Sequence, residues 1–179
     1  MAQHNIQRMP LRGTADVLVG HGETMELVEI AETGSPARPI GALPDIAADV
    51  MHGTSEMYKA TGFRPPWVGY LALVNDACVG TCAFKTPPVD GRVEIAYFTF
   101  PGHEGKGVAT DMARCLIQKA LSEPDAVRIY AQTMPEENAS TRVLDKLGFH
   151  RTAELEHPED GTVWEWELNA QLESGHVRK

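Results

Sequence analysis

The sequence predicts an α+β fold in three layers (α/β/α), with helices on both sides of a mixed, mostly antiparallel sheet of about six to seven strands. Strand patterns follow one another across short turns, and amphipathic helical patterns separate them. A glycine-spaced turn at residues 104–109 opens one of these helices. The 179 residues, 42% of them hydrophobic, suit a single domain with one core.

The amino-terminal part has the least regular pattern. Residues 1–20 are polar and turn-rich, and we expect them to form a loosely held arm before one domain over residues 21–179. The first strand is predicted at Met25–Ile30, and Asp45 introduces a helix in a region that ends at Pro65-Pro66. The buried side of this helix is expected at Ile46, Ala47, Val50, Met51 and Met57.

Three strand patterns occupy the middle of the chain. Asn75-Asp76, a dipeptide suited to a hairpin turn, separates Trp67–Val74 from Ala77–Phe84. The third pattern covers Val93–Phe100 and breaks at Pro101-Gly102.

A helix follows the glycine-spaced turn, because apolar residues recur at spacings of three and four until Pro124. Its apolar face comprises Val108, Met112, Ala113, Leu116, Ile117, Ala120 and Leu121. The remaining pattern predicts a strand at Val127–Thr133, a helix led by Asn138, and a final strand pair around Arg151–Glu156 and Thr162–Leu168.

The turn Glu104-Gly105-Lys106-Gly107-Val108-Ala109 is suited to binding a diphosphate. Glycines allow close approach of the backbone, and a helix start offers free N–H donors and a positive dipole end. A P-loop would need Ser or Thr where Gly107 stands and Gly where Phe100 stands, and a dinucleotide fingerprint would need a third Gly at Thr110. Both of these alternatives therefore fit the turn poorly.

The turn and a second motif resemble the GNAT superfamily of acyl-CoA-dependent N-acyltransferases. The family turn reads Gln or Arg, two residues, Gly, one residue, then Gly or Ala, and this chain departs from it only at Glu104. Residues 137–149 (ENASTRVLDKLGF) are similar to the family's Asn-led helix that ends in Gly-Phe. The similarity covers roughly residues 65–168 and is nearest to the subgroup with ribosomal-protein N-terminal and polyamine acetyltransferases.

The resemblance implies a GNAT-like sheet with a splayed central strand pair, and acetyl-CoA as co-substrate. Free backbone N–H groups would then meet the acyl group and pantetheine at Phe98, Thr99 and Phe100, while the two rings pack in the core. Asn138 would bind the pantetheine arm, although Asn at a helix start is also an N-cap. The turn residues implied in cofactor binding are Glu104, Gly105, Lys106, Gly107, Val108, Ala109 and Thr110.

Acetyl transfer to an amine needs a base for the amine and a proton for the leaving thiolate. Glu94 stands where several family members carry a Glu base, and an ion pair with a neighbouring Lys or Arg is the alternative role. Leu144 replaces the usual Tyr acid, so that Thr141 or Tyr97, or alternatively Tyr130, is left to donate a proton. The same replacement keeps open a noncatalytic acyl-CoA-binding module.

The charge balance bears on partners. With 25 acidic and 16 basic residues the net charge is −9, which disfavours binding to nucleic acid or an anionic membrane. We expect the acceptor to be a small amine or a peptide N-terminus, with attraction from the acidic residues of the last hairpin, Glu154, Glu156, Glu159 and Asp160. The aromatic residues expected either in the acceptor pocket or in the core are Tyr58, Phe63, Trp67 and Trp164. A homodimer stays an open alternative.

We recognise neither a membrane-spanning segment nor a secretory signal in the sequence. No apolar run approaches the ~20 residues that span a bilayer, and the start MAQHNIQRMP has no secretory apolar region, so we expect a cytoplasmic protein. Cys78, Cys82 and Cys115 are an odd count without a disulfide pattern, and we expect reduced core thiols and no metal site.

Overall fold

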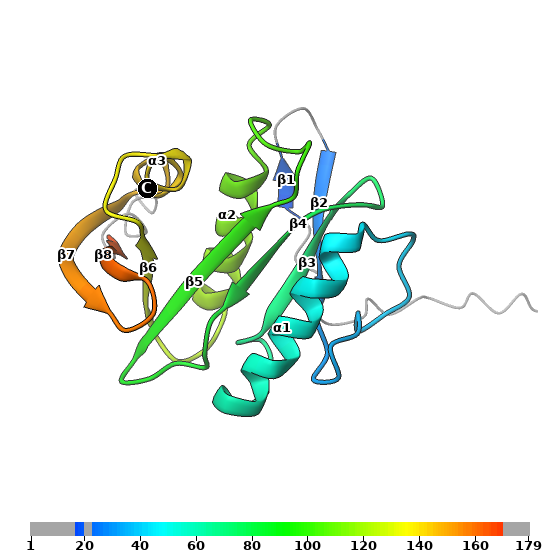
Figure 1. Cartoon of the computed structure of the whole chain (residues 1–179), viewed down its shortest axis with the longest axis horizontal. Helices are drawn as coiled ribbons and strands as arrows, with labels where there is room; N and C mark the ends of the chain where they lie inside the picture. The colour runs from blue at the N-terminus through cyan, green and yellow to red at the C-terminus, as the bar shows by residue number, and fades with distance from the viewer. Residues whose placement is uncertain (1–16, 20–22, 170–179) are drawn as a thin grey trace, which may run out of the picture.

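The computed structural model describes residues 17–19 and 23–169, which form one sheet of eight strands with three helices (Figure 1). The strand order is β1-β2-β3-β4-β5-β6-β8-β7, and within it only β5 and β6 run parallel. The elements in chain order are β1 (Val17–Val19), β2 (Glu23–Glu29), α1 (Asp45–Thr61), β3 (Gly69–Val74), β4 (Ala77–Phe84), β5 (Arg92–Thr99), α2 (Val108–Leu121), β6 (Arg128–Thr133), α3 (Ala139–Lys146), β7 (Phe149–His157) and β8 (Gly161–Leu168).

The seven strands and three helices predicted from the sequence are all present, and the structure adds one strand. This strand, β1, lies within the segment expected to be a polar arm and pairs with β2 from Val17↔Met25 to Val19↔Glu23. Three residues give too short a pattern to be recognised as a strand without the neighbour that pairs with them. The other residues of the expected arm, 1–16 and 20, lie outside the described part of the chain.

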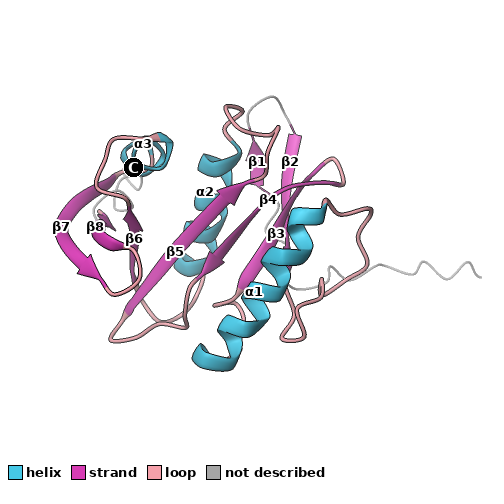
Figure 2. Ribbon diagram, viewed as in Figure 1, coloured by secondary structure: helices cyan, strands magenta, loops and turns pink. Residues whose placement is uncertain are grey.

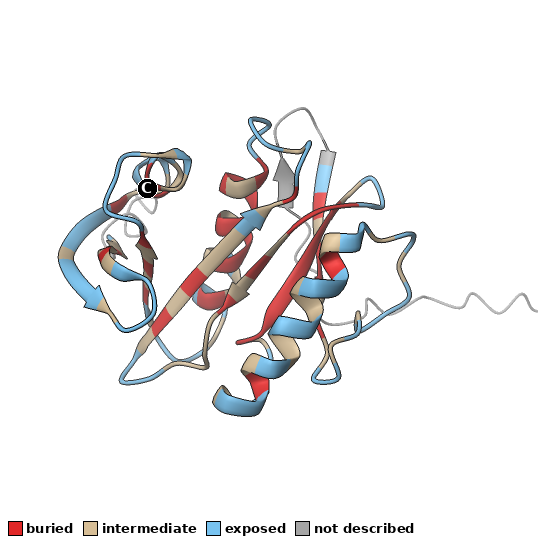
Figure 3. Cartoon of the chain, in the orientation of Figure 1, coloured by how far each residue is buried: buried red, intermediate tan, exposed pale blue. Residues whose placement is uncertain are grey.

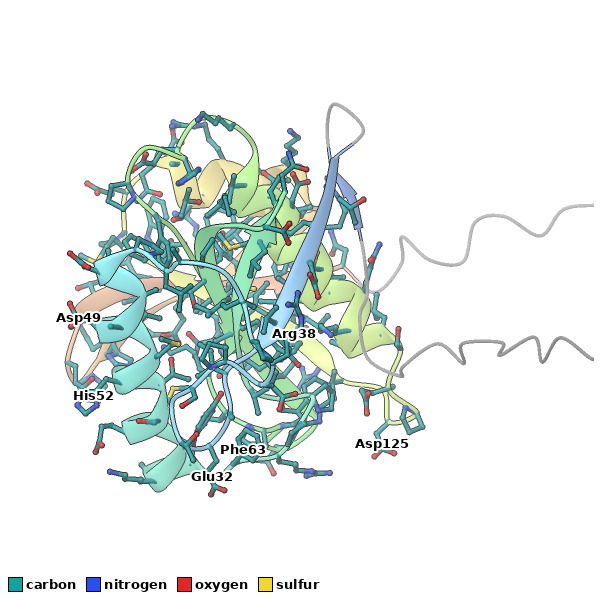
Figure 4. All side chains as sticks on the ribbon, turned by 90° about the vertical axis from the view of Figure 1, so that its right-hand side faces the viewer. Glu32, Arg38, Asp49, His52, Phe63 and Asp125 are labelled. Carbon is teal, nitrogen blue, oxygen red and sulfur yellow. The ribbon has the colours of Figure 1, made fainter. Side chains whose placement is uncertain are left out.

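Helices cover both faces of the sheet, α1 on one and α2 on the other (Figures 1 and 2). Most of α2 is buried, as expected, although Leu121 at its end is 44% exposed (Figure 3). By contrast, α1 buries only Ala47 and Tyr58, and the other apolar residues expected on its inner side are only partly buried. Asp49 and His52 are exposed on α1 and point away from the sheet (Figure 4). The inner side of α1 is therefore incompletely packed against the strands.

Parallel strands β5 and β6 separate shortly after they begin. β5 pairs with β4 from Ile95 to Thr99, but its pairing with β6 stops after the first three residues, Arg92 to Glu94. In Figure 1 the two strands lie together at one end and diverge towards the end of β5. This divergence is the expected splayed central pair, and it opens the sheet beside the start of α2.

Within the described residues, no helix has both the length and the apolar content needed to cross a membrane. The three cysteines are buried free thiols, and burial raises the pKa of each of them, that of Cys115 to about 11. They are therefore protonated core residues at neutral pH rather than nucleophiles.

Candidate active site

The last residues of β5 present backbone donors where β6 has moved away. Phe100 N–H is not among them, because it donates to the Val79 carbonyl at 2.9 Å. Residues two apart in an antiparallel strand direct their N–H groups to the same side, so the Phe98 N–H also points towards β4. Tyr97 and Thr99 therefore present their N–H groups to the open side. The expectation of a free N–H agrees with this geometry at Thr99. At Phe98 and Phe100 it does not, because their N–H groups point towards β4, and Tyr97 presents the second free N–H.

The turn after β5 has the backbone conformation that its glycines allow. Gly105 and Gly107 have φ angles of 72° and 83°, in the left-handed region that favours glycine. Gly107 is the N-cap of α2, and no side chain caps the helix there. The first N–H groups of α2 therefore lack the side-chain partner that an Asn, Asp, Ser or Thr cap would supply. Together with the helix dipole they favour an anion.

Glu104, the one departure from the family turn, is used within the turn itself. Its exposed carboxylate accepts the Gly102 N–H at 2.7 Å, and hydrogen bonds from backbone N–H groups hold its pKa below the usual value. Lys106 does not neutralise it, because the Lys106 Nζ donates instead to the Gly102 carbonyl at 3.1 Å. The Glu104 carboxylate thus stabilises the turn through the Gly102 N–H.

A pocket of about 540 Å³, here called the β5–α3 pocket, lies between the end of β5, the turn and α3. Its walls include Thr99, Gly105 and Gly107, and four acidic or basic side chains also line it. These are His103, Glu104, Arg142 and Lys146. A volume of this size with free backbone donors and nearby cations can hold an extended phosphorylated ligand.

A second pocket of about 290 Å³, here called the α1 pocket, lies between α1 and strands β4 and β5. Tyr97 and Phe98 line both pockets, so the two meet at these residues of β5. The rings of Phe98 and Phe100 were both expected in the core. Phe100 is buried there, with 1% of its surface exposed, whereas Phe98 is 46% exposed and lies outside the core. The exposed Phe98 thus belongs to the walls of both pockets.

Tyr97 is held beside the junction of the pockets. Its hydroxyl donates to the Ser140 carbonyl at 3.2 Å, across the splay from β5 to α3. Burial raises the pKa of Tyr97, so the phenol stays protonated at neutral pH. Tyr97 therefore retains a proton at the place where the two pockets join.

Glu94 lies on β5 next to the α1 pocket and is paired. Its carboxylate Oε1 is 2.9 Å from Nζ of Lys85, a residue that lines the pocket, and its side chain is 12% exposed. Tyr130 lies opposite in register on β6; burial raises its pKa, and the charge of Glu94 raises it further. Glu94 thus forms the ion pair that the sequence analysis gave as its alternative role. Lys85 lines the α1 pocket and Glu94 does not, so the carboxylate lies behind the Lys85 side chain as seen from the pocket.

Asn138 and Thr141 form a capping box at the start of α3. Asn138 Oδ1 accepts from the Ser140 and Thr141 N–H groups, and Thr141 Oγ1 accepts from the Asn138 N–H and donates to its carbonyl. Thr141 is 2% exposed and lines neither pocket. The structure therefore does not bring Thr141 to the site as a proton donor, and Leu144 is fully buried.

The cap allows a test of whether Asn138 also contacts the cofactor. Replacing Asn138 with Ala is expected to lower the free energy of unfolding by about 1 kcal/mol, because the helix loses its cap. Asn138→Ser keeps a capping oxygen but removes the amide, and should restore most of that stability. Denaturant unfolding and acetyl-CoA titration of both variants separate the roles: weaker acetyl-CoA binding in the Ser variant indicates a contact through the amide, and unchanged binding contradicts it.

The aromatic residues expected either in the acceptor pocket or in the core do not line the α1 pocket. Tyr58 and Trp67 are buried in the core, where Tyr58 OH donates to the Ile30 carbonyl at 3.0 Å. Phe63 packs edge-on against Tyr58, and Trp164 Nε1 donates to Glu154 in the last hairpin. The residues that line the α1 pocket and were not proposed for it are Val50, Gly53, Thr54, Met57, Thr81, Cys82, Ala83, Lys85 and Ala96. Of these, Val50 and Met57 carried a signal, the apolar side of the predicted helix, which was interpreted as core.

Comparison with known proteins gives the class of fold and then the family. The fold matches that of RimL, a ribosomal L7/L12 alpha-N-protein acetyltransferase, with a TM-score of 0.61 at 14% identity over 89% of this chain and 98% of that chain. It also matches aminoglycoside acetyltransferase AAC(6')-Ib in complex with coenzyme A, with a TM-score of 0.52 at 22% identity over 58% and 66% of the two chains. At these identities the likeness shows the GNAT fold.

Residues 35–150 match the family model of the acetyltransferase (GNAT) domain, and the chain belongs to this family. It is 42% identical over 86 residues to the probable N-acetyltransferase YjcK of Bacillus subtilis (strain 168), which is 46% of this chain and 47% of YjcK. It is 36% identical over 81 residues to the uncharacterized N-acetyltransferase YjdG of the same organism, over 44% and 48% of the chains. The chain thus spans about half the length of the curated relatives it matches.

Proposed function

We propose that this protein is an N-acetyltransferase that transfers the acetyl group of acetyl-CoA directly to a primary amine while both substrates are bound. The observation that carries the proposal is the meeting of two pockets at Tyr97 and Phe98, where β5 has left β6. One pocket has the backbone donors and cations suited to a CoA diphosphate, and the other opens towards α1. Two ligands that enter from these sides would place an acyl group and an amine beside the same strand.

Backbone groups and cations support the donor side of this proposal. The start of α2 would hold the diphosphate, with Arg142 and Lys146 close to the same pocket. The N–H groups of Tyr97 and Thr99 would bind the pantetheine arm and polarise the thioester carbonyl. Acetyl-CoA supplies the acyl group as a thioester. RimL and AAC(6')-Ib have both been solved with coenzyme A bound, in agreement with this use of the fold.

Two side chains would transfer protons, one as the base for the amine and one as the acid for the leaving thiolate. Glu94 takes the proton of the attacking amine through a water beside Lys85, as the N–C bond forms. When the C–S bond breaks, Tyr97 gives its hydroxyl proton to the thiolate; burial raises the pKa of Tyr97, so the phenol is in its protonated form at neutral pH. Tyr97 is preferred to Thr141 because it lines both pockets, whereas Thr141 lines neither.

Thermal unfolding with acetyl-CoA tests the donor site. A ligand that binds only the folded protein raises its stability by mass action, by ~2.7 kcal/mol at a concentration of 100 Kd. We expect a clear upward shift of Tm with acetyl-CoA and none with ATP, followed by release of free CoA when an amine is added. An equal shift with ATP would indicate a general phosphate site, and no shift at saturating acetyl-CoA would contradict the proposal.

A noncatalytic acyl-CoA-binding module is the second candidate function. The Lys85–Glu94 ion pair favours it, since a paired carboxylate needs no catalytic role. Such a module would bind acetyl-CoA but release no CoA with any amine. Measurement of binding and of turnover on the same preparation therefore distinguishes the two functions.

A further inference from the structure

We infer that the acceptor is a primary amine with a compact, mainly apolar body, and not a polyamine or an aminoglycoside. The inference rests on the proposed acetyl transfer and concerns the α1 pocket. Its basis is the chemistry of the pocket wall, which differs from the acidic site that the last hairpin suggested.

Small and apolar side chains form most of the wall. Val50 and Met57 come from α1, and Ala83 and Ala96 face one another in register across β4 and β5. Phe98 closes the side next to the other pocket. The volume of about 290 Å³ is at the lower end of small-molecule sites. The wall therefore favours contact with a small apolar group.

The polar side chains of the wall already have partners. Thr54 and Thr81 donate to the Val50 and Tyr70 carbonyls at 2.8 and 2.9 Å. Lys85 Nζ is 2.9 Å from the Glu94 carboxylate. Among the described residues no carboxylate lines the pocket. An acceptor with a second ammonium group would lose water there without gaining an unpaired carboxylate as its counter-charge.

The acidic hairpin lies outside this pocket. Glu154 accepts the Trp164 Nε1–H at 2.9 Å, and Glu156 accepts the Thr162 hydroxyl at 2.7 Å, both within the β7–β8 pair. Among the described residues, none from β7 or β8 lines the α1 pocket. The negative charge of the hairpin is therefore not available to bind a cationic group inside the pocket.

Competing amines test this inference. Free CoA release is measured with phenethylamine, spermidine and kanamycin at one pH and saturating acetyl-CoA. We expect kcat/KM for phenethylamine to exceed that of either polycation by about tenfold or more, which is the scale at which one apolar group in a pocket discriminates. Faster acetylation of spermidine or kanamycin overturns the inference and leaves the proposed function intact. No acetylation of any of the three amines counts against both.

A variant of α1 provides the structural test. Gly53 lines the pocket, and a Cβ there would meet no atom within 4 Å, so a longer side chain can enter the hollow. Gly53→Leu should therefore lower kcat/KM for phenethylamine by about tenfold or more, with the Kd of acetyl-CoA changed by less than about twofold. The Tm should not fall, because Leu is a better helix former than Gly.

His52→Leu is the matched control, because it adds the same side chain one residue away, where His52 points away from the sheet (Figure 4). It should change neither the kcat/KM for phenethylamine nor acetyl-CoA binding. Equal kcat/KM values for phenethylamine in the Gly53→Leu variant and the wild type would show that the amine binds elsewhere, and would overturn the inference.

Discussion

Replacing Glu94 with Gln is expected to lower kcat by about 10²–10⁴-fold, the usual contribution of a positioned general base. The change removes the proton acceptor and keeps the shape of the side chain. Acetyl-CoA should bind with a Kd within about twofold of the wild-type value, because Glu94 does not line the β5–α3 pocket. Steady-state kinetics with an amine and direct titration with acetyl-CoA measure the two effects separately.

Glu165→Gln provides a control from the same sheet. Glu165 pairs with Arg92 at 2.7 Å and its side chain is 13% exposed, close to the 2.9 Å and 12% of Glu94 with Lys85. The two substitutions therefore remove ion pairs of similar geometry and burial. A similar fall of kcat in both variants would show that the loss at Glu94 is structural. A noncatalytic module would show no CoA release in the wild type either.

Replacing Gly107 with Ala is expected to weaken acetyl-CoA binding by about tenfold or more, and to lower the free energy of unfolding by ~1–2 kcal/mol. The φ angle of 83° is costly for any residue with a Cβ, and the strain is relieved by moving the first turn of α2. That movement displaces the N–H groups that would bind the diphosphate. Titration calorimetry and denaturant unfolding measure the two effects.

Gly161→Ala separates strain from ligand binding. Gly161 has a φ angle of 72°, with no atom within 4 Å of an added Cβ, and it lies at the start of β8 and lines neither pocket. It should cost similar stability while leaving the Kd of acetyl-CoA unchanged. If Gly107→Ala also leaves the Kd unchanged, the diphosphate does not bind at the start of α2.

The strands, the helices and the glycine turn could be predicted from the sequence because their signals are local. Asn75-Asp76 adopts φ angles of 49° and 64°, which matches the tight hairpin turn predicted there. The fold followed from such signals together with the similarity of two motifs. The strand Val17–Val19 could not be predicted in the same way, since its pairing with β2 stabilises three residues that carry little pattern of their own.

The candidate site was less predictable, because it depends on register and on packing between distant segments. Whether Phe98 or Thr99 presents a free N–H depends on which residues of β4 and β5 form hydrogen-bonded pairs, and the hydrophobic pattern does not determine this. Whether Trp67 is in a pocket or in the core depends on its packing against Phe84. The position of Lys85 beside Glu94 likewise requires the paired strands.

The composition of the two pockets has a consequence for how such an enzyme can diverge. Under the proposed function, the acyl donor is held largely by backbone groups of β5 and α2, which most point mutations leave in place. The accepted amine is selected by residues of α1 such as Val50, Gly53 and Met57, on a helix that is incompletely packed against the sheet. Mutations on this helix would thus change the preferred amine without loss of the cofactor, so new substrate preferences can evolve while acetyl transfer is retained.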